Sequence, residues 1–369
     1  MSNDDSFQGT QAPSGALPFE SHQLLAWLNA TLHPMQPLPG PLTIEQFKGG
    51  QSNPTYLIKA DNAQWVMRTK PAAASQLLPS AHAIEREFKV MRALQDTAVP
   101  VARMLALCED ERVIGRAFYL MSYVPGRVFW APELPGLAPA QRTQVFQSMN
   151  EVLADLHLVN LERVGLSDYG RAGNYFERQI ARWSKQYITS ITEPIAEMDQ
   201  LMQWLPVNMP ELALEQRVSL VHGDFRLDNL IFDEKTLKAR AVLDWELSTL
   251  GHPLADLSYH CMAWHIAPDE FRGLAGLDLA ALGIPSEQQY IQWYCDKTQL
   301  ISPDRLEGDW HFFLAYNMFR MAAILQGIAK RIEAGTASSE QAQNAAKRAR
   351  PLAQNAWRHA QVHSQLNGR

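Results

Sequence analysis

The sequence is short of cysteine, of basic charge and of long apolar runs, and each shortage excludes a class of protein. Its three cysteines, Cys108, Cys261 and Cys295, are widely spaced and lack metal-ligand spacing, which excludes a disulfide framework and a zinc site. Lys and Arg (33) are outnumbered by Asp and Glu (39), so no basic surface for nucleic acid is expected. No apolar run reaches the roughly 18 residues of a membrane span, and the polar N-terminal segment has no signal-peptide core. We therefore expect a cytoplasmic protein that binds neither nucleic acid nor membrane.

What is present is enough apolar sequence for two domains, because 46% of the 369 residues are hydrophobic. Residues 1–39 combine a polar tail, for which we expect disorder, with one short helix that ends at prolines. Residues 40–125 hold short apolar runs between turn residues, a pattern typical of strands. Residues 126–369 carry apolar residues at mostly helical intervals, interrupted by short apolar runs at 219–221, 230–232 and 241–243 that predict strands. The sequence thus predicts an α+β fold in which a small sheet domain precedes a larger, mainly helical one.

Two features of the small domain bear on function. The apolar runs 56–59 and 65–68 predict a hairpin, and the second strand carries Arg68 and Lys70 on one face. The segment 81–94 has apolar residues at helical spacing with charges between them. We therefore expect one helix to follow two strands that present basic side chains.

The strongest chemical signal is an Asp, an Asn five residues later and a second Asp after the next predicted strand, namely Asp224, Asn229 and Asp244. The first carboxylate can accept the proton of a substrate hydroxyl. The amide and the second carboxylate offer hard oxygen ligands to Mg²⁺ on nucleotide phosphates, and magnesium needs few protein ligands. Singly, each residue could equally be a turn former or a strand-end cap. As an ordered set they indicate phosphoryl transfer.

These residues and their flanks resemble the aminoglycoside phosphotransferase and choline kinase-like family, which is itself similar to protein kinases. The likeness rests on the runs 222–224 and 243–246 and on the position of Asn229. It implies a two-lobed protein-kinase-like fold, with an antiparallel N-lobe sheet and one helix before a helical C-lobe. It also implies ATP and Mg²⁺ as cofactors, Asp224 as catalytic base, and Asn229 with Asp244 as metal ligands.

The same resemblance implies a nucleotide site in the N-lobe. Its expected members are Gly49, Gly50, Ser52, Arg68, Lys70, Glu87, Met121 and Tyr123. The glycines and Ser52 belong to a loop that looks like the family's cover over the phosphates, and the last two to the adenine-binding hinge. The cation that is often lysine in the family falls on Arg68, and arginine is not equivalent to lysine. Whether Arg68 or Lys70 pairs with Glu87 and reaches the nucleotide is open.

Two further residues are expected to support the site rather than to react, and a third to belong to the core. His222 is expected to orient the catalytic loop by hydrogen bonding, and Asp256 to hold that loop from the turn behind the metal site. His157 ends an amphipathic helix and is expected to be a core histidine.

The chain particularly resembles the kinase-like domain that is fused ahead of acyl-CoA dehydrogenases in some larger proteins. The runs 49–56, 79–87 and 247–253 carry that likeness, which implies a small-molecule acceptor such as a hydroxylated acyl compound. The alternatives are an inactive nucleotide-binding regulatory protein, an aminoglycoside kinase, and a metal-dependent hydrolase that uses His222, Asp224, Asp244 and His252 around a metal. ATP against GTP and the oligomeric state stay open.

Overall fold

The computed structural model describes residues 9–13, 17–33, 35–48, 53–61, 63–71, 83–335 and 340–368. The chain forms two compact units. Unit 1 comprises Met1–Trp130, Glu162–Leu166 and Leu227–Ser248, and unit 2 comprises Ala131–Leu161, Ser167–Arg226 and Thr249–Arg369. The expected division was a single boundary after residue 125. The segment Leu227–Ser248 thus belongs to the unit of the nucleotide residues, whereas the sequence placed it in the helical domain.

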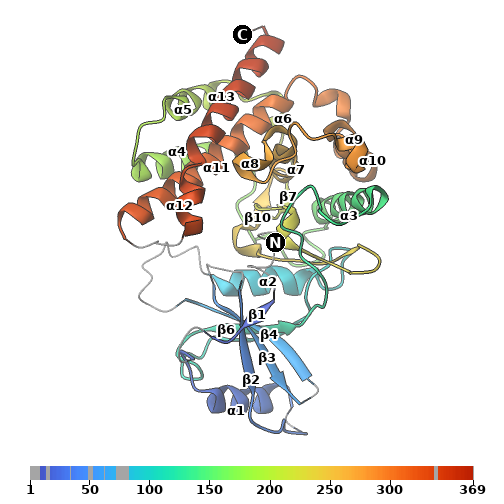
Figure 1. Cartoon of the computed structure of the whole chain (residues 1–369), viewed down its shortest axis with the longest axis vertical. Helices are drawn as coiled ribbons and strands as arrows, with labels where there is room; N and C mark the ends of the chain where they lie inside the picture. The colour runs from blue at the N-terminus through green and yellow to red at the C-terminus, as the bar shows by residue number, and fades with distance from the viewer. Residues whose placement is uncertain are drawn as a thin grey trace. The chain divides into compact units, whose positions relative to one another are not determined.

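An antiparallel six-stranded sheet forms the centre of unit 1 (Figure 1). Its strands, in the spatial order β1-β2-β3-β4-β6-β5, are β1 (Thr10–Gln11), β2 (Thr43–Phe47), β3 (Thr55–Ala60), β4 (Ala63–Thr69), β6 (Phe118–Ser122) and β5 (Met104–Cys108). Strands β3 and β4 form the expected hairpin, with Thr55 opposite Arg68. Strand β1 lies in the segment for which we expected disorder, and Thr10 pairs with Phe47 of β2.

Two helices accompany this sheet, α1 (Ser21–Thr31) and α2 (Ile84–Leu94). Figure 1 shows α1 at the lower end of the sheet and α2 at the upper end. Leu24 and Leu28 of α1 are fully buried in one cluster with Ile58 and Met67 of the sheet. Burial of each leucine is worth roughly 1.5–3 kcal/mol. The N-terminal helix, expected as a separate segment, is therefore part of the core of this unit.

The segment Leu227–Ser248 adds a short hairpin to unit 1. It consists of the 3-10 turn η2 (Leu227–Asn229), strands β8 (Leu230–Phe232) and β9 (Ala239–Val242), and the 3-10 turn η3 (Trp245–Leu247). Leu230 faces Val242 across the strand pair. The backbone N–H of Val242 donates to the carbonyl of Pro100 (2.9 Å), and Phe232 and Arg127 exchange two backbone hydrogen bonds of 2.8 Å. These bonds attach the hairpin to the rest of the unit.

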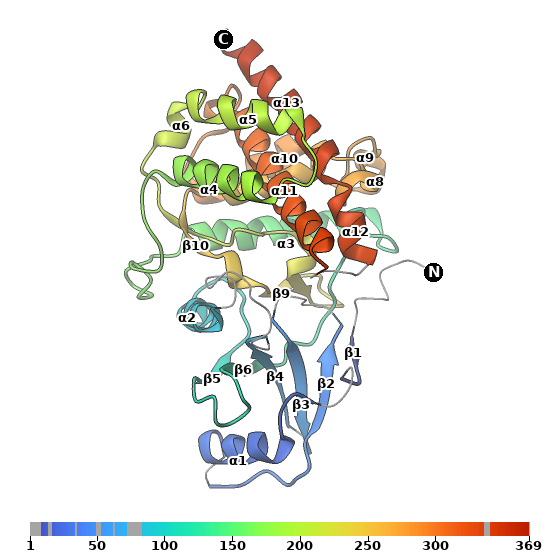
Figure 2. The same ribbon diagram turned by 90° about the vertical axis from the view of Figure 1, so that its left-hand side faces the viewer.

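Unit 2 is mainly helical (Figure 2). Its helices are α3 (Pro139–His157), α4 (Tyr175–Ser190), α5 (Ala196–Val207), α6 (Glu211–Leu214), α7 (Leu254–Cys261), η4 (Met262–His265), α8 (Pro268–Phe271), α9 (Leu279–Leu282), α10 (Glu287–Thr298), η5 (Pro303–Arg305), α11 (Trp310–Glu333), α12 (Glu340–Ala346) and α13 (Ala349–Leu366). Helix α11 packs against α13, α4 and α7. By length and composition α11 could cross a membrane, but 83% of its apolar window is buried, as in a core helix.

One short strand pair in unit 2 carries the predicted catalytic loop. Strands β7 (Ser219–Val221) and β10 (Thr249–Gly251) are antiparallel, with Val221 opposite Thr249. The loop with Asp224 follows β7, and helix α7 begins three residues after β10. The pair therefore brings the loop and the start of α7 into the same region of unit 2.

Candidate active site

In unit 1 the β8–β9 hairpin brings together the two residues that the sequence assigned to a metal. The backbone N–H of Leu243 donates to the carbonyl of Asn229 at 2.8 Å, so Asn229 and Asp244 lie at the same end of the hairpin. Asp244 has a left-handed backbone (φ 61°, ψ 62°), which costs free energy for any residue except glycine and recurs at functional sites. Asn229 is buried, whereas the Asp244 side chain is 34% exposed. Asp244 is thus the more accessible of the two.

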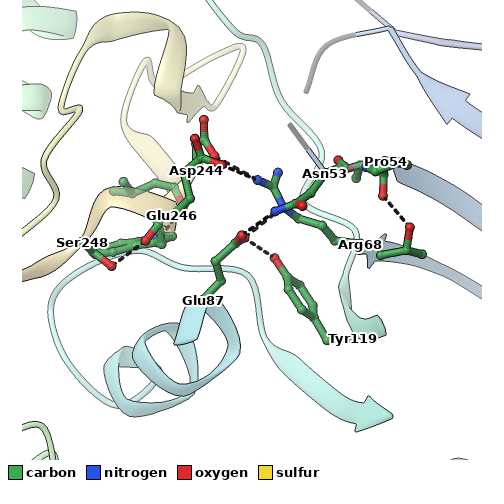
Figure 3. A network of polar contacts seen from close by, with 12 residues as sticks. Asn53, Pro54, Arg68, Glu87, Tyr119, Asp244, Glu246 and Ser248 are labelled. Atoms are coloured by element: carbon green, nitrogen blue, oxygen red, sulfur yellow. Dashed lines mark hydrogen bonds and ion pairs between the residues drawn. The ribbon is translucent and has the colours of Figure 1, made fainter. Parts of the chain in front are cut away.

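Arg68 of β4 contacts Asp244 and Glu87 with different nitrogens (Figure 3). Its Nη2 donates to Asp244 Oδ1 at 2.9 Å, and its Nε lies 2.9 Å from Glu87 Oε2. Glu246 Oε2 lies 4.0 Å from the same Nη2. Although burial opposes the charge of Arg68, the facing Glu87 carboxylate raises the pKa of the guanidinium. Arg68 is therefore a permanent cation among three carboxylates.

Glu87 of α2 is the buried end of this network. Its Oε1 accepts a hydrogen bond from Asn53 Nδ2 (3.0 Å) and its Oε2 one from the Tyr119 hydroxyl (3.0 Å). Burial raises the pKa of the Glu87 carboxyl, and the Arg68 guanidinium opposes that shift. Lys70 instead forms an ion pair with Glu85, near the unit surface. Glu87 thus lies with Arg68, not with Lys70.

The other predicted nucleotide residues are only partly visible. Met121 lies in β6, between β4 and β5, and Tyr123 follows that strand. Gly49, Gly50 and Ser52 lie outside the described residues. The structure therefore brings Arg68 and Glu87 together with Asp244, and places the predicted hinge residues in and directly after the adjacent strand β6.

In unit 2, Asp224 is held by neighbours from its own loop and from α7. The Tyr259 hydroxyl donates to Asp224 Oδ1, and Arg226 Nε lies 3.3 Å from the same oxygen. Burial and the nearby Asp224 raise the pKa of Tyr259 well above its ordinary value, so its hydroxyl remains a donor. The backbone N–H of Asp224 donates to His222 Nδ1 at 3.2 Å. His222 therefore contacts the loop backbone, as a positioning residue does.

Asp256 of α7 supports the same loop. Its carboxylate accepts hydrogen bonds from the backbone N–H groups of His222 and Gly223, and His157 Nε2 lies 3.5 Å away. Although burial opposes the charge, these contacts hold the pKa of Asp256 below its usual value. His157 Nδ1 in turn lies 2.7 Å from the Tyr294 hydroxyl. His157 is thus a buried histidine that also contacts the carboxylate behind the predicted catalytic loop.

Sequence reasoning missed two residues that contact this loop. Tyr259 lies three residues after Asp256 on α7, a spacing that puts both on one helix face. Arg320 of α11 is buried, donates to the carbonyl of Gly223, and places its guanidinium carbon 5.2 Å from the Tyr259 ring centroid. The available signal was that Arg320 is the only charged residue in the run 312–329, since such charges are rarely buried without a partner.

The donor set in unit 1 suits magnesium better than a transition metal. An amide and a carboxylate are hard oxygen ligands, and Mg²⁺ retains water in its remaining positions. Across the described ranges, no three His, Cys, Asp or Glu side chains gather into a group that could hold a metal ion. Among the described residues there is therefore no histidine-based cluster of the kind that the hydrolase alternative requires.

Comparison with known proteins agrees with this chemistry. The model of the phosphotransferase enzyme family matches residues 43–290, and the chain therefore belongs to that family. Acyl-CoA dehydrogenase family member 10 of Mus musculus is 47% identical over 321 residues, which are 86% of this chain and 29% of that protein. Family member 11 of Homo sapiens is 40% identical over 338 residues, 91% of this chain and 42% of that protein. The chain thus spans less than half the length of these relatives.

Solved structures show the fold. A candidate aminoglycoside phosphotransferase from Ralstonia eutropha is 53% identical, with a TM-score of 0.83 over 93% of this chain and 98% of that chain. Choline kinase from Cryptosporidium parvum has a TM-score of 0.62 at 12% identity, over 91% of this chain and 95% of that one. An aminoglycoside phosphotransferase in ternary complex with ADP and hygromycin B has a TM-score of 0.59 at 16% identity, over 91% of this chain and 98% of that one. The predicted resemblance and the kinase-like α+β fold are confirmed.

Proposed function

We propose that the chain transfers the γ-phosphoryl group of ATP, with Mg²⁺, to a hydroxyl of a hydroxylated acyl compound. The observation that carries the proposal is the hairpin that sets Asn229 beside Asp244, with Arg68 in contact with the latter. Oxygen ligands for a metal and a fixed cation for phosphates are the parts that phosphoryl transfer requires of a protein.

Each predicted residue has one task in this reaction. Asp224 accepts the hydroxyl proton while the acceptor oxygen forms its bond to the γ-phosphorus and the bond to the leaving ADP oxygen breaks. Arg68, braced by Glu87, holds the nucleotide phosphates, and the end of β6, with Met121 and the following Tyr123, receives the base. Asn229 and Asp244 hold Mg²⁺, which neutralises charge on the phosphates when bound.

The acceptor is the finer part of the proposal. The two curated relatives are named acyl-CoA dehydrogenase family members, which supports an acyl acceptor. A binding site for a polycationic aminoglycoside requires many acidic side chains close together. Residues 126–369 contain 23 Lys and Arg against 28 Asp and Glu, and three of these acids, Asp224, Asp244 and Asp256, already have tasks in the proposed site. An anionic or neutral acceptor with an apolar part fits this balance better.

An aminoglycoside is the second candidate acceptor. The similarity to the Ralstonia eutropha protein, a candidate aminoglycoside phosphotransferase with 53% identity, favours it. Both candidates use the same nucleotide residues, so only a comparison of acceptors separates them.

A screen of acceptors tests the proposal directly. Purified chain is assayed for Mg²⁺-dependent ADP release with hydroxy acids, hydroxyacyl-CoA thioesters, amino alcohols and aminoglycosides, and each product is checked by mass for one added phosphoryl group. We expect phosphorylation of a hydroxyacyl compound and none of a kanamycin-like drug. If only aminoglycosides are phosphorylated, the proposed acyl acceptor is wrong and an aminoglycoside takes its place. If none of the hydroxyl compounds is phosphorylated, the kinase assignment is contradicted. Asp224→Asn protein serves as the matched control.

A further inference from the structure

The Arg68 network contains one contact that the phosphotransferase reaction does not by itself require. Arg68 Nη2 donates to Asp244 Oδ1 at 2.9 Å, so the predicted metal ligand is already paired with the predicted phosphate-binding cation (Figure 3). A metal at Asp244 and a phosphate at Arg68 each compete with this ion pair. Ligand binding can therefore require Arg68 to give up one of its two carboxylate partners, Glu87 or Asp244.

Burial indicates that Glu87 is the fixed partner of Arg68 and Asp244 the exchangeable one. The Glu87 side chain is 2% exposed and has two further donors, Asn53 and Tyr119, whereas Asp244 is 34% exposed. Removing the cation from a buried carboxylate is costly, while a partly exposed carboxylate can turn to water or to a ligand at small cost.

An arginine is suited to such an exchange. Its guanidinium carries separate N–H groups in a rigid plane, so Nε can remain at Glu87 while Nη2 changes partner. A lysine ammonium at the same position is a single point charge that both carboxylates must share. The departure from the family's usual lysine therefore has a geometric consequence.

We propose that Arg68 couples metal binding to nucleotide binding by partner exchange: it holds Asp244 in the ligand-free chain, and a nucleotide phosphate that takes the guanidinium releases the carboxylate to the divalent cation. The inference rests on the proposed function. A cation alone must compete with the positive charge of Arg68 for Asp244, and a phosphate alone meets the Asp244 charge. Each ligand removes the obstacle to the other, so the coupling is reciprocal.

The first test measures Mn²⁺ binding by electron paramagnetic resonance, with Mn²⁺ in place of Mg²⁺ and no nucleotide. Arg68→Lys, which keeps the charge but loses the two-armed contact, should tighten Mn²⁺ binding about 3–10-fold, near the low end of the coupling usually found between two sites. Arg112→Lys is the matched control, because Arg112 pairs with Asp110 at the surface of the same unit. Equal Mn²⁺ affinity in the wild type and in Arg68→Lys would overturn the inference.

The second test uses a different variant and keeps the inference testable if Arg68→Lys fails to fold. ADP binding is measured by calorimetry in EDTA for Asp244→Asn and Glu246→Gln. Both changes remove one carboxylate charge, but only Asp244 lies at hydrogen-bond distance from Arg68, while Glu246 is 4.0 Å away. Asp244→Asn should tighten metal-free ADP binding about 3–10-fold and Glu246→Gln less than about twofold.

The outcomes separate this inference from the proposed function. If Asp244→Asn and Glu246→Gln tighten ADP binding equally, the effect comes from the loss of a negative charge in general, and the partner exchange at Arg68 is contradicted. Mn²⁺ binding that Asp244→Asn leaves unchanged would show that Asp244 is no metal ligand, and the proposed metal site would fail as well. If Asp244→Asn loses Mn²⁺ binding but Arg68→Lys binds Mn²⁺ as the wild type does, the coupling through Arg68 is contradicted and the proposed metal site is retained.

Discussion

The two units hold their functional carboxylates in different ways. In unit 1, Asp244 accepts a hydrogen bond from the buried cation Arg68, whereas in unit 2 Asp224 Oδ1 accepts one from the neutral hydroxyl of Tyr259 and lies 3.3 Å from Arg226 Nε. The carboxylates behind them differ too. Burial raises the pKa of Glu87, yet the pKa of Asp256 stays below its usual value although Asp256 is equally buried. Asp256 has two backbone N–H donors and His157, so the partners of a buried carboxylate, more than its burial, decide its charge.

The largest effect is expected from removing the predicted catalytic base of unit 2, Asp224. Asp224→Asn should lower turnover by about 10²–10⁴-fold, the usual contribution of a positioned general base. Unit 1 keeps its network, so the affinity for MgATP should be nearly unchanged. Steady-state kinetics and calorimetric titration measure the two quantities, and retained turnover would remove Asp224 from the mechanism.

Breaking the network of unit 1 should cost stability as well as nucleotide binding. Arg68→Ala leaves the buried Glu87 without its cation, and we expect a loss of about 3–5 kcal/mol in the free energy of unfolding. Lys70→Ala breaks a partly exposed pair with Glu85 and should cost less than about 1 kcal/mol. Denaturant unfolding compares the two variants. Equal losses, or a higher ATP KM in Lys70→Ala alone, would contradict the roles given to these strand neighbours.

A buried histidine makes the stability of unit 2 depend on pH. Burial lowers the pKa of His260 to about 3, and its ring lies among aromatic residues, 4.7 Å from that of Tyr290. The pKa of His260 in the folded protein lies below the ordinary value of about 6.5, so its neutral ring stabilises the fold fully above that pH. This contribution to the free energy of unfolding is lost as the pH falls, by about 2 kcal/mol at pH 5. His260→Phe should remove this part of the loss. Urea unfolding at pH 7 and pH 5 checks it, and an unchanged pH dependence would exclude His260 as the cause.

The smallest effect is expected at the neutral partner of Asp224. Tyr259→Phe removes one hydrogen bond to the catalytic carboxylate and should lower kcat about 3–10-fold, corresponding to the roughly 0.5–1.5 kcal/mol of one such bond. The KM for ATP should not change. An increase in that KM without a change in kcat would place Tyr259 in nucleotide binding instead.

The sequence by itself determined the β3–β4 hairpin and the short strands around Asn229 and Asp244, but not strand β1 or the unit to which Leu227–Ser248 belongs. The strands at 219–221 and 230–232 lie where the apolar runs predicted them. Asn229 and Asp244 were predictable as a pair because they are close along the chain and one hairpin joins them. The glycine loop lies outside the described residues, so its role remains a prediction.

Only the tertiary structure decided which side chains hold the carboxylates. Arg68 and Asp244 are 176 residues apart, and Arg320 contacts Gly223 across 97 residues. Periodicity predicts which face of a strand or helix carries a residue, but Arg68 and Lys70 share a face, and the pattern does not say which one meets Glu87. That choice depends on how α2 packs against the sheet. Likewise Tyr259 reaches Asp224 because the strand pair β7–β10 brings the start of α7 to the catalytic loop, an arrangement of segments that only folding creates.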